Sequence, residues 1–119
     1  MKNKKVSIIL PCHNEELSIS DTLIKISNLL INKCHFNNFQ IFAIDDGSTD
    51  NTWKIIDDLS KKNNHVIGFK LKKNYGKDIA ITNSLKEINS DIYIVMDSDG
   101  EHPIDKIELM LSKFDENKI

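Results

Sequence analysis

Short apolar segments alternate with segments of helical periodicity along the whole chain, and this alternation limits the fold more than any other feature. Four apolar, β-rich runs read as strands, namely Val6–Leu10, Phe39–Ile44, Val66–Leu71 and Ile92–Met96. Strands that alternate with helices form parallel sheets joined by right-handed crossovers. We therefore expect an α/β fold with a mostly parallel sheet, in a single domain that covers residues 1–119.

The expected helices follow the strands in turn. The first spans about 15–31 and carries one apolar face, formed by Ile19, Leu23, Ile26 and Leu30. Asn14 and Asp50 are suitable N-caps for the first and second helices. A third helix is expected over about 77–88, and Pro103 is well placed in the first turn of a last helix.

Composition describes an ordinary small domain. The chain has 119 residues, 29% of them charged, with a formal net charge of −2, which gives no reason to expect a nucleic-acid partner. Its two cysteines, Cys12 and Cys34, lie far apart, so a reducing, cytoplasmic setting is the simplest interpretation. The basic N-terminus lacks the apolar length of a signal peptide, and no run approaches the roughly 18 apolar residues of a membrane span.

An Asp-x-Asp motif directly follows the fourth apolar run. Asp97 and Asp99 come just after this strand, at the carboxyl edge of the expected sheet, where open α/β sheets bind ligands. Glu101 adds a third carboxylate, and such oxygens suit a hard divalent cation that neutralises phosphates. The alternative is a solvated acidic loop.

A second acidic pair, Asp45 and Asp46, follows the second strand. Adjacent carboxylates repel each other unless a cation or a hydrogen-bond donor is close by. Asp46 is suited to accept hydrogen bonds from a base or a ribose. Because Asp-Gly is a common turn pair, the segment 45–50 can also be simply a well-made loop.

Two further segments complete the set of candidates. The first strand ends at Pro11, and a proline followed by a turn would hold the backbone rigid beside a planar ligand. Lys77 opens a helix just after a glycine, at the kind of position that attracts anions, so it is a candidate phosphate contact. Most of the neighbouring lysines are expected to be merely solvated.

Taken together, these segments resemble a family-2 glycosyltransferase of the GT-A fold. The resemblance rests on Val6–Glu16, Ile44–Asp50, Asn74–Lys77 and Met96–Pro103, whose order and spacing match across nearly the whole chain. The Asn-aromatic-Gly-Lys segment and the His-Pro ending look most like polyprenol-phosphate sugar transferases. The resemblance implies a Rossmann-like, three-layer α/β/α nucleotide-sugar-binding fold that stops one helix after the Asp-x-Asp motif.

The resemblance also implies roles for individual residues. Pro11 and Glu15 would lie against the nucleoside, and Asp46 would bind the base or ribose. Asp97 and Asp99, assisted by Glu101, would bind Mg²⁺ or Mn²⁺ together with the diphosphate. The full expected donor-binding set is Pro11, His13, Asn14, Glu15, Asp45, Asp46, Lys77 and Asp97.

The leading hypothesis is an inverting sugar transferase, or its donor-binding half, that uses a UDP- or GDP-sugar. A polyprenyl-phosphate acceptor would be ionised near neutral pH and need no catalytic base, and it would bring the protein to the inner face of the membrane. The alternative is a binding module that holds the nucleotide sugar without catalysis. A signalling receiver domain is disfavoured, because its acidic pair would follow the first strand.

An exposed apolar edge at 92–96 predicts self-association.

Overall fold

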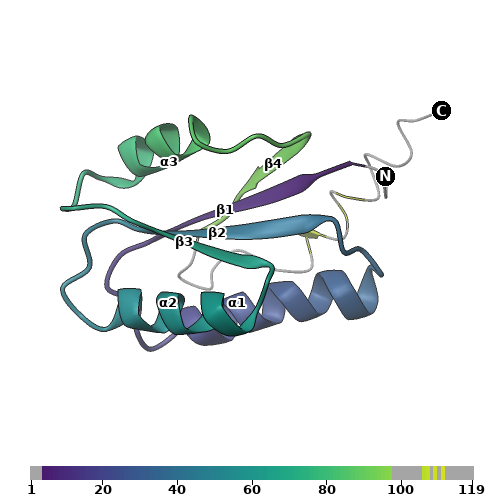
Figure 1. The fold of residues 1–119 in the computed structure, drawn as a ribbon, viewed down its shortest axis with the longest axis horizontal. Coiled ribbons are helices and arrows are strands. Elements are labelled where there is room, and N and C mark those ends of the chain that lie inside the picture. The colour runs from purple at the N-terminus through teal and green to yellow at the C-terminus, as the bar shows by residue number, and fades with distance from the viewer. Residues whose placement is uncertain (1–3, 98–105, 108, 110, 112–119) are drawn as a thin grey trace.

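The computed structural model describes residues 4–97, 106, 107, 109 and 111, and in this part of the chain strands and helices alternate (Figure 1). The elements, in order, are β1 (Val6–Cys12), α1 (Ile19–Asn28), the π-helical turn η1 (Leu29–Lys33), β2 (Phe39–Asp45), α2 (Thr52–Lys62), β3 (Val66–Lys70), α3 (Lys77–Leu85) and β4 (Ile92–Val95). Every strand predicted from the sequence is present, with ends within two residues of those expected.

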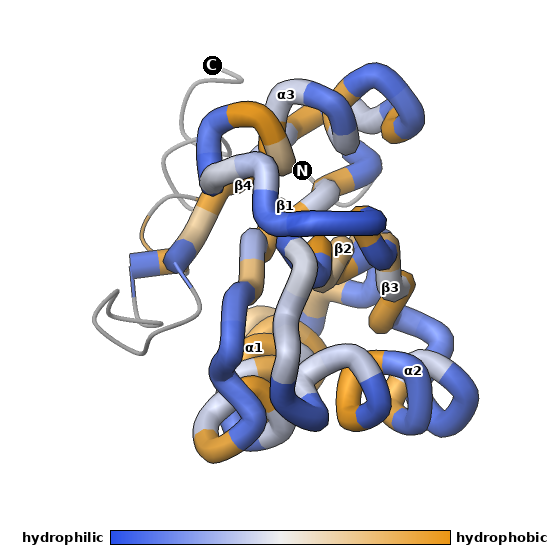
Figure 2. Tube along the Cα trace, turned by 90° about the vertical axis from the view of Figure 1, so that its left-hand side faces the viewer, coloured by the Kyte–Doolittle hydropathy of each residue, from blue (hydrophilic) through white to orange (hydrophobic). Residues whose placement is uncertain are grey.

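All described strands are parallel and lie in the order β3-β2-β1-β4. Helices α1 and α2 cover one face of the sheet, and α3 covers the other (Figures 1 and 2). The prediction of a three-layer α/β/α fold with a parallel sheet is therefore confirmed. In parallel sheets the carboxyl ends of the strands meet at one edge, so the loops that follow β1, β2 and β3 lie there together with residues 96 and 97, which follow β4.

The strand β1 lies at the centre of the core. All seven of its residues are buried, because helices cover both faces of the sheet. Ile8 and Leu10 belong to the larger apolar cluster, which includes the buried face of α1, whereas Ile9 belongs to a smaller cluster that includes Ala80 of α3. Burying one such aliphatic side chain stabilises a fold by about 1.5–3 kcal/mol. This rigid centre fixes the strand end on which the site is built.

Helix boundaries differ most from the sequence-based expectations. The first helix was expected from about residue 15, but α1 begins at Ile19 after Ser18, and the N-cap prediction for Asn14 is wrong. The N-cap of α2 is Asn51 rather than Asp50. Asn14 instead binds the β2–α2 loop, and Asp50 binds both Thr52 at the start of α2 and the Glu16 N–H in the β1–α1 loop. The helix expected after Pro103 is described only at 106, 107, 109 and 111, where Ile107 and Leu111 are buried.

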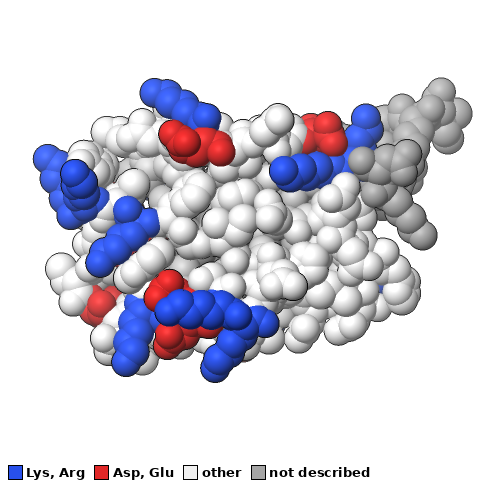
Figure 3. Space-filling model, viewed as in Figure 1, with Lys and Arg blue, Asp and Glu red and all other residues white. Residues whose placement is uncertain are grey.

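Each outer strand of the described sheet pairs on one side only. The last strand on one edge, β4, pairs with β1, and two of its side chains, Tyr93 and Val95, are about two-fifths exposed. The charged side chains on the face in Figure 3 are of both signs and interspersed. Among the described residues there is no helix with the length and apolar character needed to cross a bilayer.

Candidate functional site

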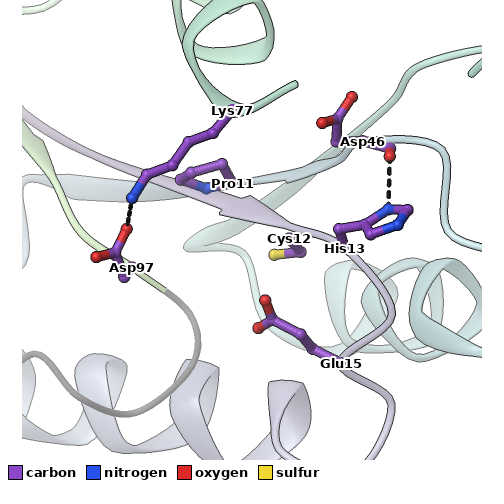
Figure 4. A pocket seen from close by; sticks show the side chains of 7 residues that line it. All are labelled: Pro11, Cys12, His13, Glu15, Asp46, Lys77 and Asp97. Carbon is purple, nitrogen blue, oxygen red and sulfur yellow. Dashed lines mark hydrogen bonds and ion pairs between the residues drawn. The ribbon is translucent and has the colours of Figure 1, made fainter. Parts of the chain in front are cut away.

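A pocket of about 190 Å³ opens at the carboxyl edge of the sheet (Figure 4). Its walls come from the ends of β1 and β2, from the start of α3, and from Asp97, two residues after the end of β4. The lining residues are Pro11, Cys12, His13, Glu15, Asp46, Lys77 and Asp97. Sequence reasoning had proposed all of these except Cys12, and it had also proposed two residues that do not line the pocket, Asn14 and Asp45.

The pocket begins at Pro11, where β1 still pairs with β2 but no longer with β4. The Ile9 carbonyl accepts a hydrogen bond from Met96 on the β4 side, whereas the Cys12 carbonyl accepts from Asp46 on the β2 side. Backbone groups of a strand alternate between its two neighbours, so the missing N–H of Pro11 faces the β4 side, beyond the last β4 pair. A proline at this position removes no sheet hydrogen bond, and it leaves the space in which the pocket forms.

Opposite charges face each other across the pocket. The Lys77 ammonium forms an ion pair with Asp97 Oδ1 (Figure 4). Lys77 is the first residue of α3, and Asp97 follows the end of β4, so the pair connects two layers of the fold. Both side chains are partly exposed, and a pair of this kind contributes only about 0–1 kcal/mol to stability. Its importance lies in placing a cation and a carboxylate at the mouth of one pocket.

The carboxylate of Asp46 binds the loop that precedes α3. Its Oδ1 accepts the Tyr75 N–H at 2.9 Å, and its Oδ2 accepts the Gly76 N–H at 3.1 Å. The residue as a whole is only 4% exposed. Hydrogen bonds to a charged acceptor are stronger than neutral ones, so this contact joins the end of β2 firmly to the start of α3.

The ring of His13 joins three loops at the rim of the pocket. Its Nδ1 lies 2.8 Å from the Asp46 carbonyl, and its Nε2 lies 3.3 Å from the Asn74 amide nitrogen. The Asn74 oxygen already accepts the Gly76 N–H, which orients the amide with its NH₂ group toward the ring. The imidazole therefore carries its proton on Nδ1 and accepts at Nε2. Sequence reasoning had proposed His13 but had missed Asn74 as its partner.

A second set of bonds holds the β1–α1 loop against the β2–α2 loop. Asn14, which has a φ of 51°, accepts the Thr49 N–H on its Oδ1 at 2.8 Å. The Glu15 N–H donates to Thr52 Oγ1 at 2.8 Å. These bonds use Asn14 to shape the loop and place Glu15 at the pocket. Asn14 and Glu15 were equal candidates for donor binding in the sequence, but only Glu15 lines the pocket.

The other acidic residue at the end of β2, Asp45, is fully buried and lies outside the pocket lining. Its Oδ1 accepts the Ser48 N–H at 3.2 Å, and among the described residues Oδ2 has no hydrogen-bond partner. Asp45 closes the turn before α2, while Asp46, one residue later, reaches the pocket.

The proposed metal ligands are described only in part. Asp99 and Glu101 lie outside the described residues, and within the described part no three His, Cys, Asp or Glu side chains gather at one point. The Asp97 carboxylate is paired with the Lys77 ammonium. Its carboxylate oxygens are of the type that Mg²⁺ and Mn²⁺ prefer. Asp97 therefore fits a divalent cation by the chemistry of its oxygens.

Comparison with known proteins decides the family. The model of "Glycosyl transferase family 2" matches residues 7–119, almost the entire chain. The chain belongs to glycosyl transferase family 2. The GT-A fold expected from the motifs is thereby confirmed, and the pocket described above lies inside the matched region.

Solved glycosyltransferases share this fold. A mannosyltransferase from Pyrobaculum calidifontis, in complex with GDP-Man and Mn²⁺, is 20% identical with a TM-score of 0.74, over 88% of this chain and 30% of that one. S. aureus TarS in complex with UDP is 25% identical with a TM-score of 0.74, over 94% and 32% of the two chains. Glucosyl-3-phosphoglycerate synthase from Mycobacterium tuberculosis, in complex with Mn²⁺, UDP-Glc and phosphoglyceric acid, is 25% identical with a TM-score of 0.63, over 81% and 34%. The chain therefore spans about one third of the length of these glycosyltransferases.

Proposed function

We propose that this chain carries the donor site of a glycosyltransferase that uses a nucleoside-diphosphate sugar, either a UDP- or a GDP-sugar. One observation carries the proposal. In a family-2 chain, the Lys77 ammonium and the Asp97 carboxylate face each other across a pocket at the carboxyl edge of a parallel sheet. Ligands bind at this edge in open α/β folds. Neighbours of the same fold have been solved with UDP, with UDP-Glc and with GDP-Man.

Each lining residue has a distinct task in this proposal. Pro11 and Glu15 border the part of the pocket that would take the nucleoside, with the proline as a rigid apolar wall. Lys77 would contact the diphosphate, since an ammonium at a helix start attracts phosphate oxygens. Asp97, with Asp99 and Glu101, would hold Mg²⁺ or Mn²⁺. When bound, such an ion would stabilise the negative charge that develops on the departing diphosphate.

The acceptor that we propose is a polyprenyl phosphate at the inner face of the membrane. Its phosphate oxygen would be ionised near neutral pH, where the second pKa of a phosphate monoester is about 6. It could then attack the anomeric carbon of the sugar without a catalytic base and invert its configuration. The Asn-aromatic-Gly-Lys segment at 74–77 and the His-Pro at 102–103 motivate this choice. The acceptor is tested by incubating the chain with the donor that it binds and a polyprenyl phosphate in detergent, and sugar that remains on the nucleotide would argue against it.

Calorimetric titration with UDP, GDP and their sugars, with and without Mn²⁺, tests the donor site. We expect Mn²⁺-dependent binding to one nucleotide, reduced at least tenfold in Asp97→Asn, because a ligand charge and the partner of Lys77 are both lost. Asp21→Asn, an exposed change in α1, is the matched control and should bind like the wild type. Binding that is equal in the two variants would contradict the assignment of Asp97.

A second function rests on the described pocket, in which no lining residue has a role proposed toward the acceptor. In this alternative the chain binds the nucleotide sugar but does not transfer it. The two functions separate in one experiment, in which binding is measured by calorimetry and release of the nucleoside diphosphate is followed with the acceptor present. Binding without release supports the binding module.

A further inference from the structure

The loop between β3 and α3, residues 71–76, carries a local excess of positive charge. Lys72 and Lys73 are exposed, and no acidic residue occurs in the sequence from 59 to 77, although the whole chain has a formal net charge of −2. Lysine side chains project at the left-hand end of the view in Figure 3, where this loop lies in Figure 1. The loop therefore presents positive charge on a protein that is acidic overall.

Apolar side chains are exposed beside these lysines. Tyr75 is 39% exposed, and Ile79, in the first turn of α3, is 49% exposed. The Lys73 ammonium lies 5.2 Å from the centre of the Tyr75 ring, so a cation and an aromatic side chain share one place on the surface. A soluble anion would contact lysines alone, whereas lysines next to aromatic and aliphatic side chains are typical of surfaces that meet an anionic bilayer.

The fold holds this loop in a fixed position. The Asp46 carboxylate accepts the Tyr75 N–H at 2.9 Å, and a Cβ atom on Gly47 would lie only 2.4 Å from the main-chain nitrogen of Asn74. The main chain of the loop is thus anchored against the end of β2, while the side chains of Lys72 and Lys73 are exposed. A loop that is already ordered loses little conformational freedom when it contacts a partner.

The loop leads directly into the pocket. Lys77, the first residue of α3, follows the loop and lines the pocket at the carboxyl edge of the sheet (Figure 4). A bilayer in contact with the loop would therefore lie close to the pocket. The exposed Asp78, the residue after Lys77, is the one acidic residue in the sequence from 59 to 86, so the lysines dominate the charge of this segment.

We propose that Lys72, Lys73, Tyr75 and Ile79 form a docking surface for an anionic lipid bilayer. The two lysines contact the lipid headgroups, and the two apolar side chains enter the interface between headgroups and acyl chains. The inference rests on the proposed function for its purpose, which is to bring a lipid-phosphate acceptor to the pocket. The contact with the bilayer itself requires neither nucleotide nor metal, so it is measured without them.

Co-sedimentation with lipid vesicles tests the docking surface. One set of vesicles consists of phosphatidylcholine, and the other contains phosphatidylcholine and phosphatidylglycerol in equal parts. We expect the wild-type chain to bind only the second set, and added salt to weaken this binding because it screens the lysines. Lys72→Gln/Lys73→Gln should lower the affinity about thirtyfold, the loss expected for two lysines at an anionic surface.

Matched controls lie elsewhere on the molecule. Lys4→Gln/Lys5→Gln removes another adjacent, exposed pair, just before β1 at the amino edge of the sheet, and should change the affinity less than about threefold. Ile79→Ser should lower the affinity about three- to tenfold, because part of an aliphatic side chain no longer leaves water. Ile24→Ser in α1, where the side chain is 43% exposed, should leave it unchanged.

Two kinds of result would overturn the inference. The first is a wild-type chain that stays in the supernatant with the phosphatidylglycerol vesicles, or equal losses in the two double-lysine variants, and either would exclude this loop as the bilayer contact. The second is release from the vesicles by inorganic phosphate at constant ionic strength, together with an unchanged affinity in Ile79→Ser. This second result would assign the lysines to a soluble anion.

Failure of the proposed function has a different signature. Nucleotide binding is measured by calorimetry in the absence of vesicles. A chain that binds anionic vesicles but no nucleotide would overturn the donor site and leave the docking surface in place. A chain that binds nucleotide but no vesicles would overturn the docking surface alone.

Discussion

Gly47 and Gly76 both have positive φ values, 68° and 97°, but they meet different surroundings. A Cβ atom on Gly47 would overlap the main chain of Lys73 and Asn74, at 2.4 Å from each, whereas one on Gly76 would meet no atom within 4 Å. Gly47 is therefore needed for a close approach between loops, and Gly76 only for its backbone conformation. The two glycines, which lie in two different loops, are therefore required for different physical reasons.

We expect Gly47→Ala to destabilise the domain more than Gly76→Ala. The unfavourable φ costs about 1–3 kcal/mol in either variant, and the overlap with main-chain atoms adds to this only at Gly47. Urea unfolding of the two variants gives the comparison, with Gly76→Ala as the matched control. Equal losses of unfolding free energy would mean that the two loops can separate without cost.

At the level of elements, the start of α2 depends on the Asp50 carboxylate. Its Oδ1 accepts the N–H and the hydroxyl of Thr52 at 2.9 and 2.5 Å, and its Oδ2 accepts the Glu16 N–H at 3.3 Å. Burial raises the pKa of Asp50, but these hydrogen bonds together outweigh it and hold the pKa below its ordinary value. The charged carboxylate thus stabilises both the helix start and its contact with the β1–α1 loop.

A lowered pKa in the folded state implies a pH-dependent contribution to stability. The contribution of Asp50 is complete above the pKa of the unfolded chain, about 3.9, and is lost as the pH falls through the lower folded value. We expect Asp50→Asn to be less stable than wild type at pH 7, and the difference to shrink below about pH 4. Urea unfolding from pH 7 to pH 3 measures this trend, with Asp58→Asn as a control. A difference that stays constant over this range would contradict the role of the charge.

On the scale of the whole molecule, the sheet formed by the described residues has β4 at one edge, where it pairs with β1. Tyr93 and Val95 project from the face that α3 covers elsewhere, and they are 41% and 43% exposed. An exposed edge strand with apolar side chains can pair with another chain. The self-association expected from the sequence therefore remains a prediction, now with a defined strand.

We expect the 119-residue chain to associate at micromolar concentrations through β4. Val95→Lys should shift the population toward monomer in sedimentation velocity, because a charge on an edge strand opposes pairing. Ile79→Lys on α3 is the matched control, since Ile79 is similarly exposed at 49% but lies outside the sheet edge. A wild-type chain that sediments as a monomer at all concentrations would contradict the prediction, as would equal effects of the two variants.

The sequence by itself determined the elements and their class. The apolar runs predicted all four described strands, because hydrophobic periodicity reports burial over a few residues. The carboxyl ends of parallel strands meet at one edge, so the sequence also placed Pro11, Asp46 and Asp97 near one another. Cys12 was missed, since a cysteine inside an apolar strand gives no local sign of a ligand.

Only the tertiary structure shows which of two neighbouring residues lines the pocket and which one holds a loop. Asp45 and Asp46 are equivalent in the sequence, but only Asp46 lines the pocket, and its carboxylate is directed to amides about thirty residues further along the chain. Of the two expected caps, Asn14 binds a neighbouring loop instead of its own helix, whereas Asp50 binds both Thr52 at the start of α2 and the β1–α1 loop. Sequence patterns predict structure only over a few neighbouring residues. These contacts join residues far apart in the chain, so they depend on the order of the strands and on how closely the loops approach one another. Only the folded molecule brings such groups within hydrogen-bonding distance.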